Sequence, residues 1–543
     1  MVPLTEVRVN ALYYGDNLTV LRDQIERESV DLIYLDPPFN SQATYNVLFR
    51  STAGERSQAQ IEAFEDTWHW GEEAERAFDE VVHSWNTDAA ELLRALRTFL
   101  KENDVMAYLC MMAVRLLELH RVLMPTGSLY LHCDPTASHY LKLVLDAIFG
   151  KERFRNEIVW LRSPPRGHAF TRFPSSHDVL LCYSKGEHCT WNADEVFREY
   201  DLENLDEKTA GKYTLKDESG RLYQLTSLLN PNPDRPHLTY EFLGVTRVWR
   251  WTRERMNAVY ESGLIVQPRP GAVPRFKRYL DKQKGKPIGD VWTDIPPINS
   301  QAQERLGYPT QKPVALLERI ITASSNEGDV VLDPFCGCGT TIHAAQKLKR
   351  EWIGIDITHL AISLIEKRLN DAFPGIKYEV HGTPKDLEGA RALAAQDKYQ
   401  FQWWAVSLVN AVPFGGKKKG ADSGIDGLIY FKPEGKTTEK AVVSVKGGDN
   451  VNVAMVRDLA HVVDREKARI GVFITLADST GPMRTEAVKA GHYETLYGKY
   501  PKIQILTIQE LFSGKQPNIP LVDSASFKKA PKEKTGEQPD LPF

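Results

Sequence analysis

The amino-acid sequence predicts an α/β protein with a doubly wound sheet, because apolar strand-like runs alternate with polar turns and helical segments. The clearest unit is residues 328–357, "GDVVLDPFCGCGTTIHAAQKLKREWIGIDI". "VVLD" is strand-like, "PFCGCGTT" is a tight glycine-rich turn, "IHAAQKLK" has helical spacing, and "WIGIDI" predicts a second strand. A strand, turn, helix and strand in this order form the core of a Rossmann-like sheet.

A second apolar strand has an unusual end at residues 31–41, "DLIYLDPPFNS". Two successive prolines stop a central strand or a helix, so the strand must finish before them. The tip combines an acid, two rigid residues and an aromatic ring. It is either a plain loop or a place that binds a flat substrate able to form hydrogen bonds.

Length and composition set the limits of the interpretation. At about 150 residues per domain, 543 residues predict about three units. The net charge is −4, so overall charge alone does not indicate nucleic acid. The six cysteines suggest no disulfide framework, which favours a reducing, cytoplasmic setting. We expect no signal peptide and no membrane span.

Several further motifs stand in a fixed order. They are "YGDNLTVL" (14–21), "DPPF" (36–39), "GSLYLHCD" (127–134), "FRNEIVW" (154–160), "YPTQKP" (308–313), "DVVLDPFCGCGTT" (329–341) and "GIDI" (354–357). This set resembles the β-class amino-DNA methyltransferases, which use S-adenosylmethionine. The aromatic-rich stretch "FEDTWHW" (64–70) resembles the insert of the type III modification subunits. The resemblance implies a catalytic part at 1–185 and a cofactor-binding part at 291–380 of one sheet.

The resemblance gives the acidic tip a chemical role. The lone pair of an exocyclic amine is delocalised into the base, so an enzyme must localise it and hold it in line with the methyl donor. The Asp36 carboxylate and the Pro37 carbonyl can each accept one N–H bond, and Pro37 and Pro38 fix the backbone direction. Phe39 offers a face for a base rotated out of the duplex. Asp36 favours adenine N6, with N4-cytosine as the alternative.

The resemblance also implies the cofactor contacts. Residues expected at the methionine end of S-adenosylmethionine are Asp333, Phe335, Gly337, Gly339 and Thr340. Thr310 and Lys312 should lie beside them, Asp356 should bind the ribose, and Asp16 should lie near the cofactor adenine. Each could instead be a cap or turn residue. His132 ends another apolar strand, which favours a purely structural role.

Residues 186–290 match none of these motifs and are expected to hold the variable target-recognition region. Between residues 235 and 286 there are twelve Lys or Arg against four Asp or Glu, with aromatic residues interleaved. Basic side chains bind phosphates, and arginine can read guanine edges. The predicted contacts to double-stranded DNA are Arg247, Arg250, Arg253, Arg255, Arg275, Lys277 and Arg278. The alternative is a solvated basic face.

A second α/β domain is expected at 396–515, followed by a disordered tail at 516–543. "GIDG" and "VSVKGG" resemble the Mrr-like branch of the PD-(D/E)xK restriction endonucleases. The resemblance implies that Asp426 binds Mg²⁺ and that Lys446 activates water, but Ser444 replaces the usual Glu or Gln. The domain is therefore either a weak endonuclease or a non-cleaving DNA-binding module.

No GxxxxGK[ST] phosphate loop occurs in the chain, so ATP-driven translocation is not expected of it. The sequence leaves open a separate restriction or motor subunit, and also a homodimer.

Overall fold

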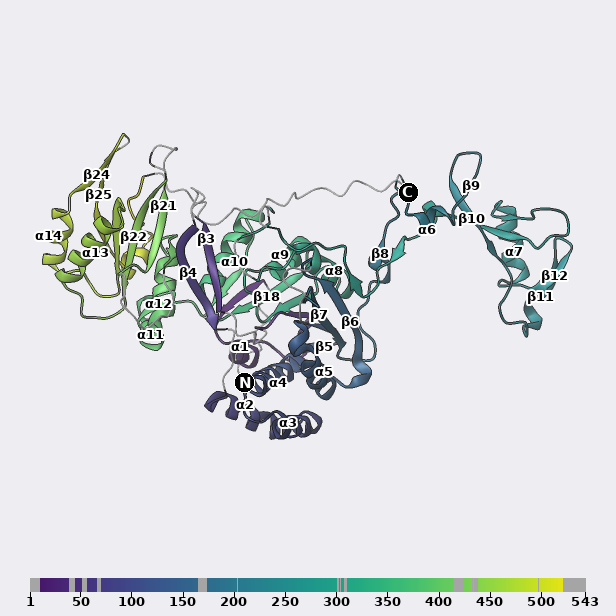
Figure 1. Cartoon of the computed structure of the whole chain (residues 1–543), viewed down its shortest axis with the longest axis horizontal. Coiled ribbons are helices and arrows are strands. Elements are labelled where there is room, and N and C mark those ends of the chain that lie inside the picture. Colours follow the sequence, from purple (N-terminus) through teal and green to yellow (C-terminus); the bar gives the residue numbers. More distant parts are fainter. Residues whose placement is uncertain are drawn as a thin grey trace, which may run out of the picture. The chain divides into compact units, whose positions relative to one another are not determined.

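The structure is a computed structural model, and it divides into two compact units (Figure 1). One unit combines residues 1–191 with 290–543, and the other spans 192–289. The described residues are 10–38, 44–50, 56–65, 70–164, 173–202, 204–299, 302, 304–306, 310–414, 424–431, 433, 438–496 and 498–520. Phe39 and residues 521–543 of the predicted tail lie outside them.

The first unit is built on a nine-stranded sheet with the order β16-β6-β7-β5-β2-β17-β18-β1-β19. The strands are β1 (Ala11–Tyr14), β2 (Val30–Leu35), β5 (Leu123–Cys133), β6 (Phe154–Leu161), β7 (His177–Ser184), β16 (Val291–Trp292), β17 (Val330–Asp333), β18 (Glu351–Asp356) and β19 (Glu379–His381). Neighbouring strands are parallel, except that β7 runs against β5 and β6. The predicted doubly wound sheet is confirmed.

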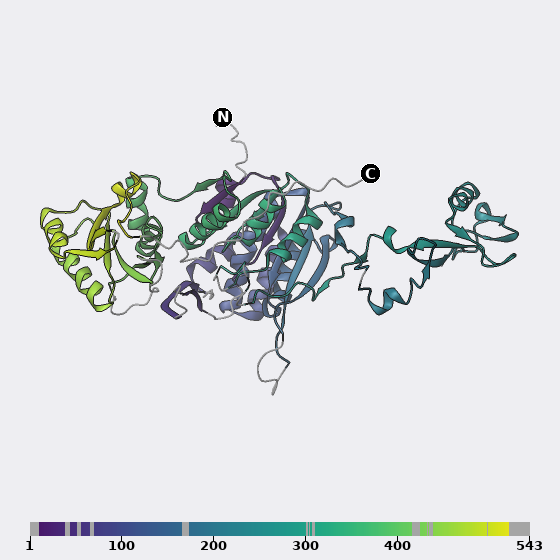
Figure 2. The same ribbon diagram turned by 90° about the horizontal axis from the view of Figure 1, so that it is seen from above.

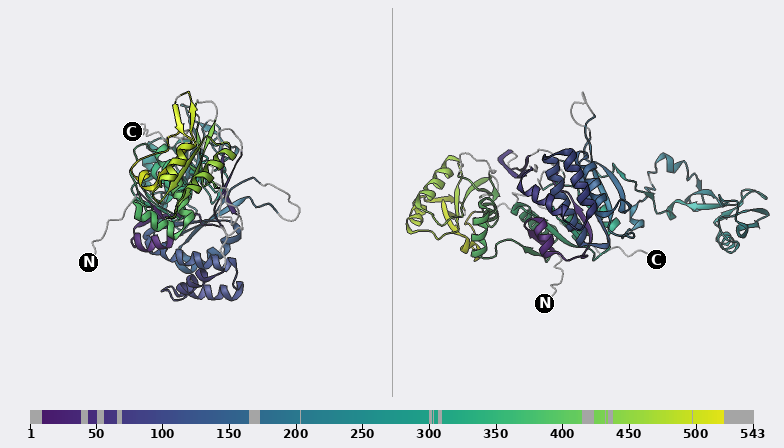
Figure 3. Two further views of the ribbon diagram at one scale, coloured as in Figure 1. Left: turned by 90° about the vertical axis from the view of Figure 1, so that its left-hand side faces the viewer. Right: turned by 90° about the horizontal axis from the view of Figure 1, so that it is seen from below.

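Helices cover both faces of this sheet (Figure 1). One face carries α1 (Asn17–Gln24), α4 (Asp104–Val122) and α5 (Pro135–Phe149), with α2 (Glu72–Val82) and α3 (Thr87–Leu100) as an outer pair (Figure 3). The other face carries α8 (Val314–Ser324), α9 (Thr340–Lys347) and α10 (His359–Ala372). Strands buried on both faces read as continuous apolar runs, which is why the sequence pattern was informative.

Outside this sheet, β3 (Thr44–Arg50) and β4 (Arg56–Glu65) form an antiparallel hairpin. Among the described residues, no helix combines the length and the apolar character that a membrane crossing requires.

The unit at 192–289 contains small antiparallel sheets. Its elements are β8 (Phe197–Arg198), α6 (Glu207–Ala210), β9 (Leu215–Lys216), β10 (Leu222–Ser227), β11 (Thr239–Phe242), β12 (Val245–Val248), α7 (Arg253–Glu261), β13 (Ile265–Val266), β14 (Arg275–Tyr279) and β15 (Lys286–Pro287). Its core is built around Trp249, which is fully buried and donates from Nε1 to the Tyr240 carbonyl at 2.8 Å. Tyr240 and Phe242 lie in the same core, so these aromatic residues stabilise the unit instead of facing a nucleic acid.

The C-terminal domain has its own five-stranded sheet with the order β20-β21-β22-β23-β26 (Figure 2). Its elements are α11 (Leu387–Gln396), α12 (Lys398–Ser407), β20 (Val412–Pro413), β21 (Gly427–Phe431), β22 (Glu439–Lys446), α13 (Val453–Arg465), β23 (Ile470–Thr475), α14 (Gly481–Lys489), β24 (His492–Thr495), β25 (Gly498–Pro501), β26 (Ile503–Thr507) and α15 (Ile508–Phe512). Separate apolar cores cover the two faces of the sheet. The predicted α/β domain is confirmed, with a helix before two strands, of which the first directly follows Asp426 and the second ends at Lys446.

Candidate active site

The acidic tip and the glycine-rich turn meet because β2 and β17 are neighbouring parallel strands. Asp36 follows β2 and Asp333 ends β17, so both acids lie at the carboxyl edge of the sheet, where ligands bind in doubly wound folds. A cavity of about 280 Å³ opens there. The predicted site residues that line it are Asp16, Asp36, Pro38, Thr310, Lys312, Asp333, Phe335, Gly337, Thr340 and Asp356.

Pro37 and Gly339 were predicted in the site but do not line the cavity. Pro37 is buried beside Asp36. Gly339 has a φ of +72°, and a Cβ there would lie 2.7 Å from the Ile365 side chain. Glycine is needed at this position because the turn approaches α10 closely.

Hydrogen bonds hold the glycine-rich turn against β18. The Gly337 backbone N–H donates to Asp356 Oδ2 at 2.9 Å, and the Thr358 hydroxyl and N–H donate to Asp356 Oδ1 at 2.8 Å. In the turn itself, the Phe335 N–H donates to Asp333 Oδ1 at 3.0 Å. Asp356 thus supports the turn in addition to its predicted contact with the ribose.

Burial acts on both of these acids. It raises the pKa of Asp333 to about 7 and the pKa of Asp356 to about 6, although the hydrogen bonds that each carboxylate accepts oppose the change. Their charges are therefore poorly solvated, and a cationic ligand in the cavity would stabilise the ionised forms.

Lys312 contacts the predicted catalytic acid directly. Its ammonium forms an ion pair with the Asp36 carboxylate, and only 11% and 18% of the two side chains are exposed. The prediction placed Lys312 on the cofactor side of the cavity. The structure shows that this ion pair also joins the "TQKP" segment to the end of β2, although the two residues are 276 positions apart in the sequence.

Sequence reasoning missed a network centred on Arg115, which also lines the cavity. This buried guanidinium donates to Asn17 Oδ1 at 2.6 Å and to Asp16 Oδ1 at 2.7 Å. The Asn17 amide in turn donates to the Pro334 carbonyl at 2.9 Å. One sequence feature could have indicated this network: Arg115 is the single charged residue in the apolar run "AYLCMMAVRLL" at 107–117 of α4.

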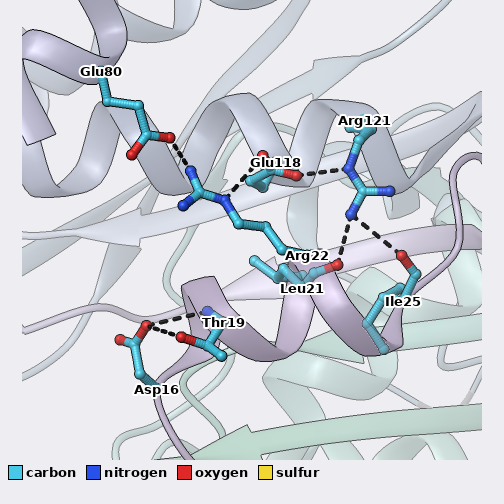
Figure 4. Close-up of polar contacts among 8 residues, drawn as sticks. All are labelled: Asp16, Thr19, Leu21, Arg22, Ile25, Glu80, Glu118 and Arg121. Atoms are coloured by element: carbon cyan, nitrogen blue, oxygen red, sulfur yellow. Dashed lines mark hydrogen bonds and ion pairs between the residues drawn. The ribbon is translucent and has the colours of Figure 1, made fainter.

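Figure 4 shows how the rest of α1 is fixed behind Asp16. Asp16 caps the helix by accepting from the Thr19 N–H at 3.2 Å. At the other end, Arg121 donates to the Leu21 and Ile25 carbonyls at 2.6 and 3.2 Å. An ion-pair cluster that joins α1, α2 and α4 consists of Arg22, Glu80, Glu118 and Arg121 (Figure 4).

The predicted DNA-binding residues all lie in the unit at 192–289, and all except half-buried Lys277 are exposed. Two of them stack on aromatic rings: Arg253 lies 5.0 Å from the Tyr240 ring centroid and Arg255 lies 4.7 Å from that of Trp251. Arg250 Nε donates to the Leu229 carbonyl at 3.0 Å. Arg247, Arg275 and Arg278 also lie on the surface.

In the C-terminal domain, Asp426 precedes β21 and lies against β22. Its Oδ2 accepts from the Val445 N–H at 2.6 Å, directly between Ser444 and Lys446. Ser444 is buried, whereas Lys446 at the end of β22 is partly exposed. The three predicted residues are therefore close together. Within the described ranges, no cluster of three or more His, Cys, Asp or Glu side chains has metal-binding geometry.

Comparison with known proteins assigns the class. Residues 30–367 match the family model described as DNA methylase, which is more than half of the chain, and the chain belongs to this family of DNA methyltransferases. Its substrate is therefore DNA. Residues 393–513 match the model described as restriction endonuclease. The predicted combination of a methyltransferase with an endonuclease-like domain is confirmed.

Individual relatives agree with this class. The chain is 31% identical to type II methyltransferase M.EcaI of Enterobacter cloacae over 66% of this chain and 69% of that protein. It is 24% identical to DNA adenine methyltransferase YhdJ of Escherichia coli K12 over 66% and 83%. Among solved structures, a Thermus thermophilus protein described as "Putative DNA Modification Methylase", in complex with S-adenosyl-L-methionine, aligns over 68% of this chain and 99% of its own, with 17% identity and a TM-score of 0.32.

Proposed function

We propose that the chain transfers a methyl group from S-adenosylmethionine to adenine N6 at a specific site in double-stranded DNA, as part of a restriction–modification system. The main support is the single cavity that carries both Asp36 and the glycine-rich turn. The adenine methyltransferase among the relatives favours N6 over the N4-cytosine alternative. Four acids and two bases line the cavity, and this excess suits a cofactor that carries a sulfonium and an ammonium group.

The chain contributes positioning and electrostatics to the reaction. S-adenosylmethionine supplies an activated methyl group when bound. The Asp36 carboxylate accepts one N–H of the target amine and the Pro37 carbonyl accepts the other, which localises the nitrogen lone pair toward the methyl group. Lys312 holds the Asp36 carboxylate in place before the amine arrives.

Replacement of Asp36 tests this proposal. Asp36→Ala removes the charged acceptor and should cost roughly 3 kcal/mol of transition-state stabilisation, or about a hundredfold in kcat, by analogy with oxyanion-hole donors. Calorimetric binding of S-adenosylmethionine should stay nearly unchanged. Asp31→Ala is the matched control, because Asp31 lies on the same strand and accepts from the Val330 N–H at 2.9 Å away from the cavity.

The control variant Asp31→Ala should lose stability but keep the kcat of the wild type. Wild-type kcat in Asp36→Ala would reject the catalytic role of Asp36. Mass spectrometry of the product DNA tests the substrate separately, since detection of N4-methylcytosine alone would refute adenine N6.

We propose that residues 186–290 recognise the DNA sequence, on the support of their exposed arginines. Exchange of 192–289 for the corresponding unit of a relative should change the methylated site and preserve cofactor binding. Sequencing of DNA from expressing cells would measure the site, and an unchanged site would place recognition elsewhere.

A second function, slow Mg²⁺-dependent DNA cleavage by the C-terminal domain, is favoured by the proximity of Asp426 and Lys446. One carboxylate gives a weak magnesium site, because the remaining ligands must be waters or backbone oxygens. Asp426→Ala and Lys446→Ala should each abolish cleavage of unmethylated DNA without affecting methylation. Lys440→Ala is the control, since Lys440 lies at the other end of β22 and pairs with Glu466.

If the domain binds DNA but does not cleave it with either Mg²⁺ or Mn²⁺, this result would instead support the alternative of a non-cleaving DNA-binding module. A cytoplasmic location, a homodimer, and a separate restriction or motor subunit remain predictions.

A further inference from the structure

A buried polar row crosses three strands at the edge of the sheet that carries the cavity. The Tyr34 hydroxyl on β2 lies 2.8 Å from His132 Nδ1 on β5, and His132 Nε2 lies 3.2 Å from Asp178 Oδ2 on β7. None of the three residues is more than 2% exposed. Arg162 pairs with the other Asp178 oxygen at 3.1 Å. Tyr34 alone of the three buried residues lines the cavity.

The chemistry of the row restricts where its protons lie. Burial acts to raise the pKa of Asp178. The hydrogen bond and the charge interaction with His132, followed by the nearby Lys312 and Arg162 charges, outweigh it, so the pKa lies below the ordinary value. An ionised carboxylate can only accept, so His132 Nε2 must donate to it. His132 Nδ1 accepts from the Tyr34 hydroxyl when the imidazole is neutral, and donates to it when the imidazole is protonated.

The position of Tyr34 matters because two acids of the site lie close by. Tyr34 is two residues before Asp36 on the same strand. Burial is the main cause that raises its pKa, and the next causes are the Asp36 and Asp333 carboxylates. The phenol oxygen therefore lies near both the proposed catalytic acid and the start of the glycine-rich turn.

We propose that His132 is neutral and that Asp178 and His132 are positioning residues that turn the Tyr34 proton away from the cavity, so that the phenol oxygen presents its lone pairs to the positively polarised sulfonium methyl of the bound cofactor. The inference rests on the proposed function. A lone pair aimed at this group favours the charged methyl donor over the neutral product, S-adenosylhomocysteine. Tyr34 thereby contributes to the preference of the cavity for substrate over product.

A neighbouring tyrosine provides a matched control. Tyr130 pairs with Tyr34 across β2 and β5, is equally buried, and forms a 2.7 Å hydrogen bond with Ser324. It does not line the cavity. Tyr34→Phe and Tyr130→Phe therefore remove the same atom in comparable surroundings, and both should lower the melting temperature.

The first experiment measures calorimetric affinities of the full-length variants for S-adenosylmethionine and S-adenosylhomocysteine. Tyr34→Phe should weaken binding of S-adenosylmethionine about tenfold and change binding of S-adenosylhomocysteine less than twofold. Tyr130→Phe should leave the ratio of the two affinities unchanged. Equal weakening for both ligands in Tyr34→Phe, or no weakening for either, would overturn the inference.

The second experiment tests the orientation of the hydroxyl. In Asp178→Asn the side-chain amide can donate to His132 Nε2, which moves the imidazole proton to Nδ1 and reverses the bond to Tyr34. The same selective loss of S-adenosylmethionine affinity should follow, and the double variant Tyr34→Phe with Asp178→Asn should bind like Tyr34→Phe alone. Additive losses would refute an action through Tyr34.

Neither outcome depends on whether DNA methylation is observed. If the wild type binds S-adenosylmethionine but methylates no adenine, the proposed function fails while the affinity ratios still test Tyr34. If Asp178→Asn does not fold, the tyrosine pair alone decides the inference.

Discussion

Arg115→Met should weaken cofactor binding, because Arg115 joins three parts of the cavity wall. The substitution removes the Arg115 donor from Asn17 Oδ1. Because Asn17 is only 8% exposed, water replaces this hydrogen bond poorly, and the loss costs about 1–3 kcal/mol of folding free energy. The Asp16 side chain is 39% exposed, so water replaces most of its lost bond at a cost of about 1 kcal/mol or less. We therefore expect the protein to fold with its stability reduced by roughly 1–4 kcal/mol.

The effect on binding follows from the same contacts. Asn17 holds the Pro334 carbonyl at 2.9 Å, and Asp16, Asn17 and Pro334 all line the cavity. Loss of their common anchor should raise the dissociation constant for S-adenosylmethionine by roughly 10–100-fold, equivalent to about 1.4–2.8 kcal/mol. Isothermal titration calorimetry on the purified variant measures this, together with thermal unfolding.

Arg121→Met is the matched control for this prediction. Arg121 lies on the same helix and anchors the other end of α1, away from the cavity (Figure 4). It should lower stability by a similar amount and change cofactor affinity less than threefold. Unchanged affinity in Arg115→Met, or an equal loss in Arg121→Met, would show that Arg115 acts only through general stability.

Three further predictions concern other parts of the chain. Gly339→Ala should reduce both stability and cofactor affinity in calorimetry and thermal unfolding, because its Cβ would lie 2.7 Å from the Ile365 side chain. The control Gly328→Ala, which has a similar φ but no atom within 4 Å of the added Cβ, should reduce stability alone. The pKa of Asp333 is raised from 3.8 to about 7 in the folded state, so between these pH values the folded state binds more protons than the unfolded state. The free energy of unfolding should therefore fall as the pH rises through this range. Denaturant titrations of Asp333→Asn should show a shallower fall than those of the wild type. Arg247→Ala should lower the salt dependence of DNA binding by about one phosphate contact in fluorescence anisotropy titrations, and Arg221→Ala, whose guanidinium already pairs with Asp281, should lower it less.

The sequence was most informative where chemistry depends on neighbouring residues. The "FCGCG" turn requires glycine for its backbone geometry, and the prolines of "DPPF" must end a strand, so both motifs carry their structure locally. Parallel strands that are buried on both faces also appear in the sequence as continuous apolar runs, so each can be recognised without knowing which strand it pairs with. These features were sufficient to predict the doubly wound sheet, whereas the residues on the two sides of the cavity were predicted from the resemblance to the β-class methyltransferases.

Pairs that lie far apart in the chain could not be read in this way. Lys312 meets Asp36, and His132 lies between Tyr34 and Asp178, only because the strand order brings them together. His132 was interpreted as a structural residue at a strand end, and nothing in "LYLHCD" indicates its partners. The interleaved aromatics of 235–286 were interpreted as a nucleic-acid signal, whereas Trp249, Tyr240 and Phe242 belong to the buried core of the unit.

The strand order also shows how the inserted unit could vary without disturbing the cavity. The unit at 192–289 is inserted between β7 and β16, and β16 is the edge strand of the sheet. Asp36 and the glycine-rich turn follow β2 and β17, which are separated from that edge by β5, β7 and β6. A change in the length or sequence of the inserted unit therefore alters none of the strand pairs that bring Asp36 and the glycine-rich turn together. The pairs that keep these two strands in register, Val331 with Leu32 and Leu332 with Ile33, lie entirely within the two strands themselves.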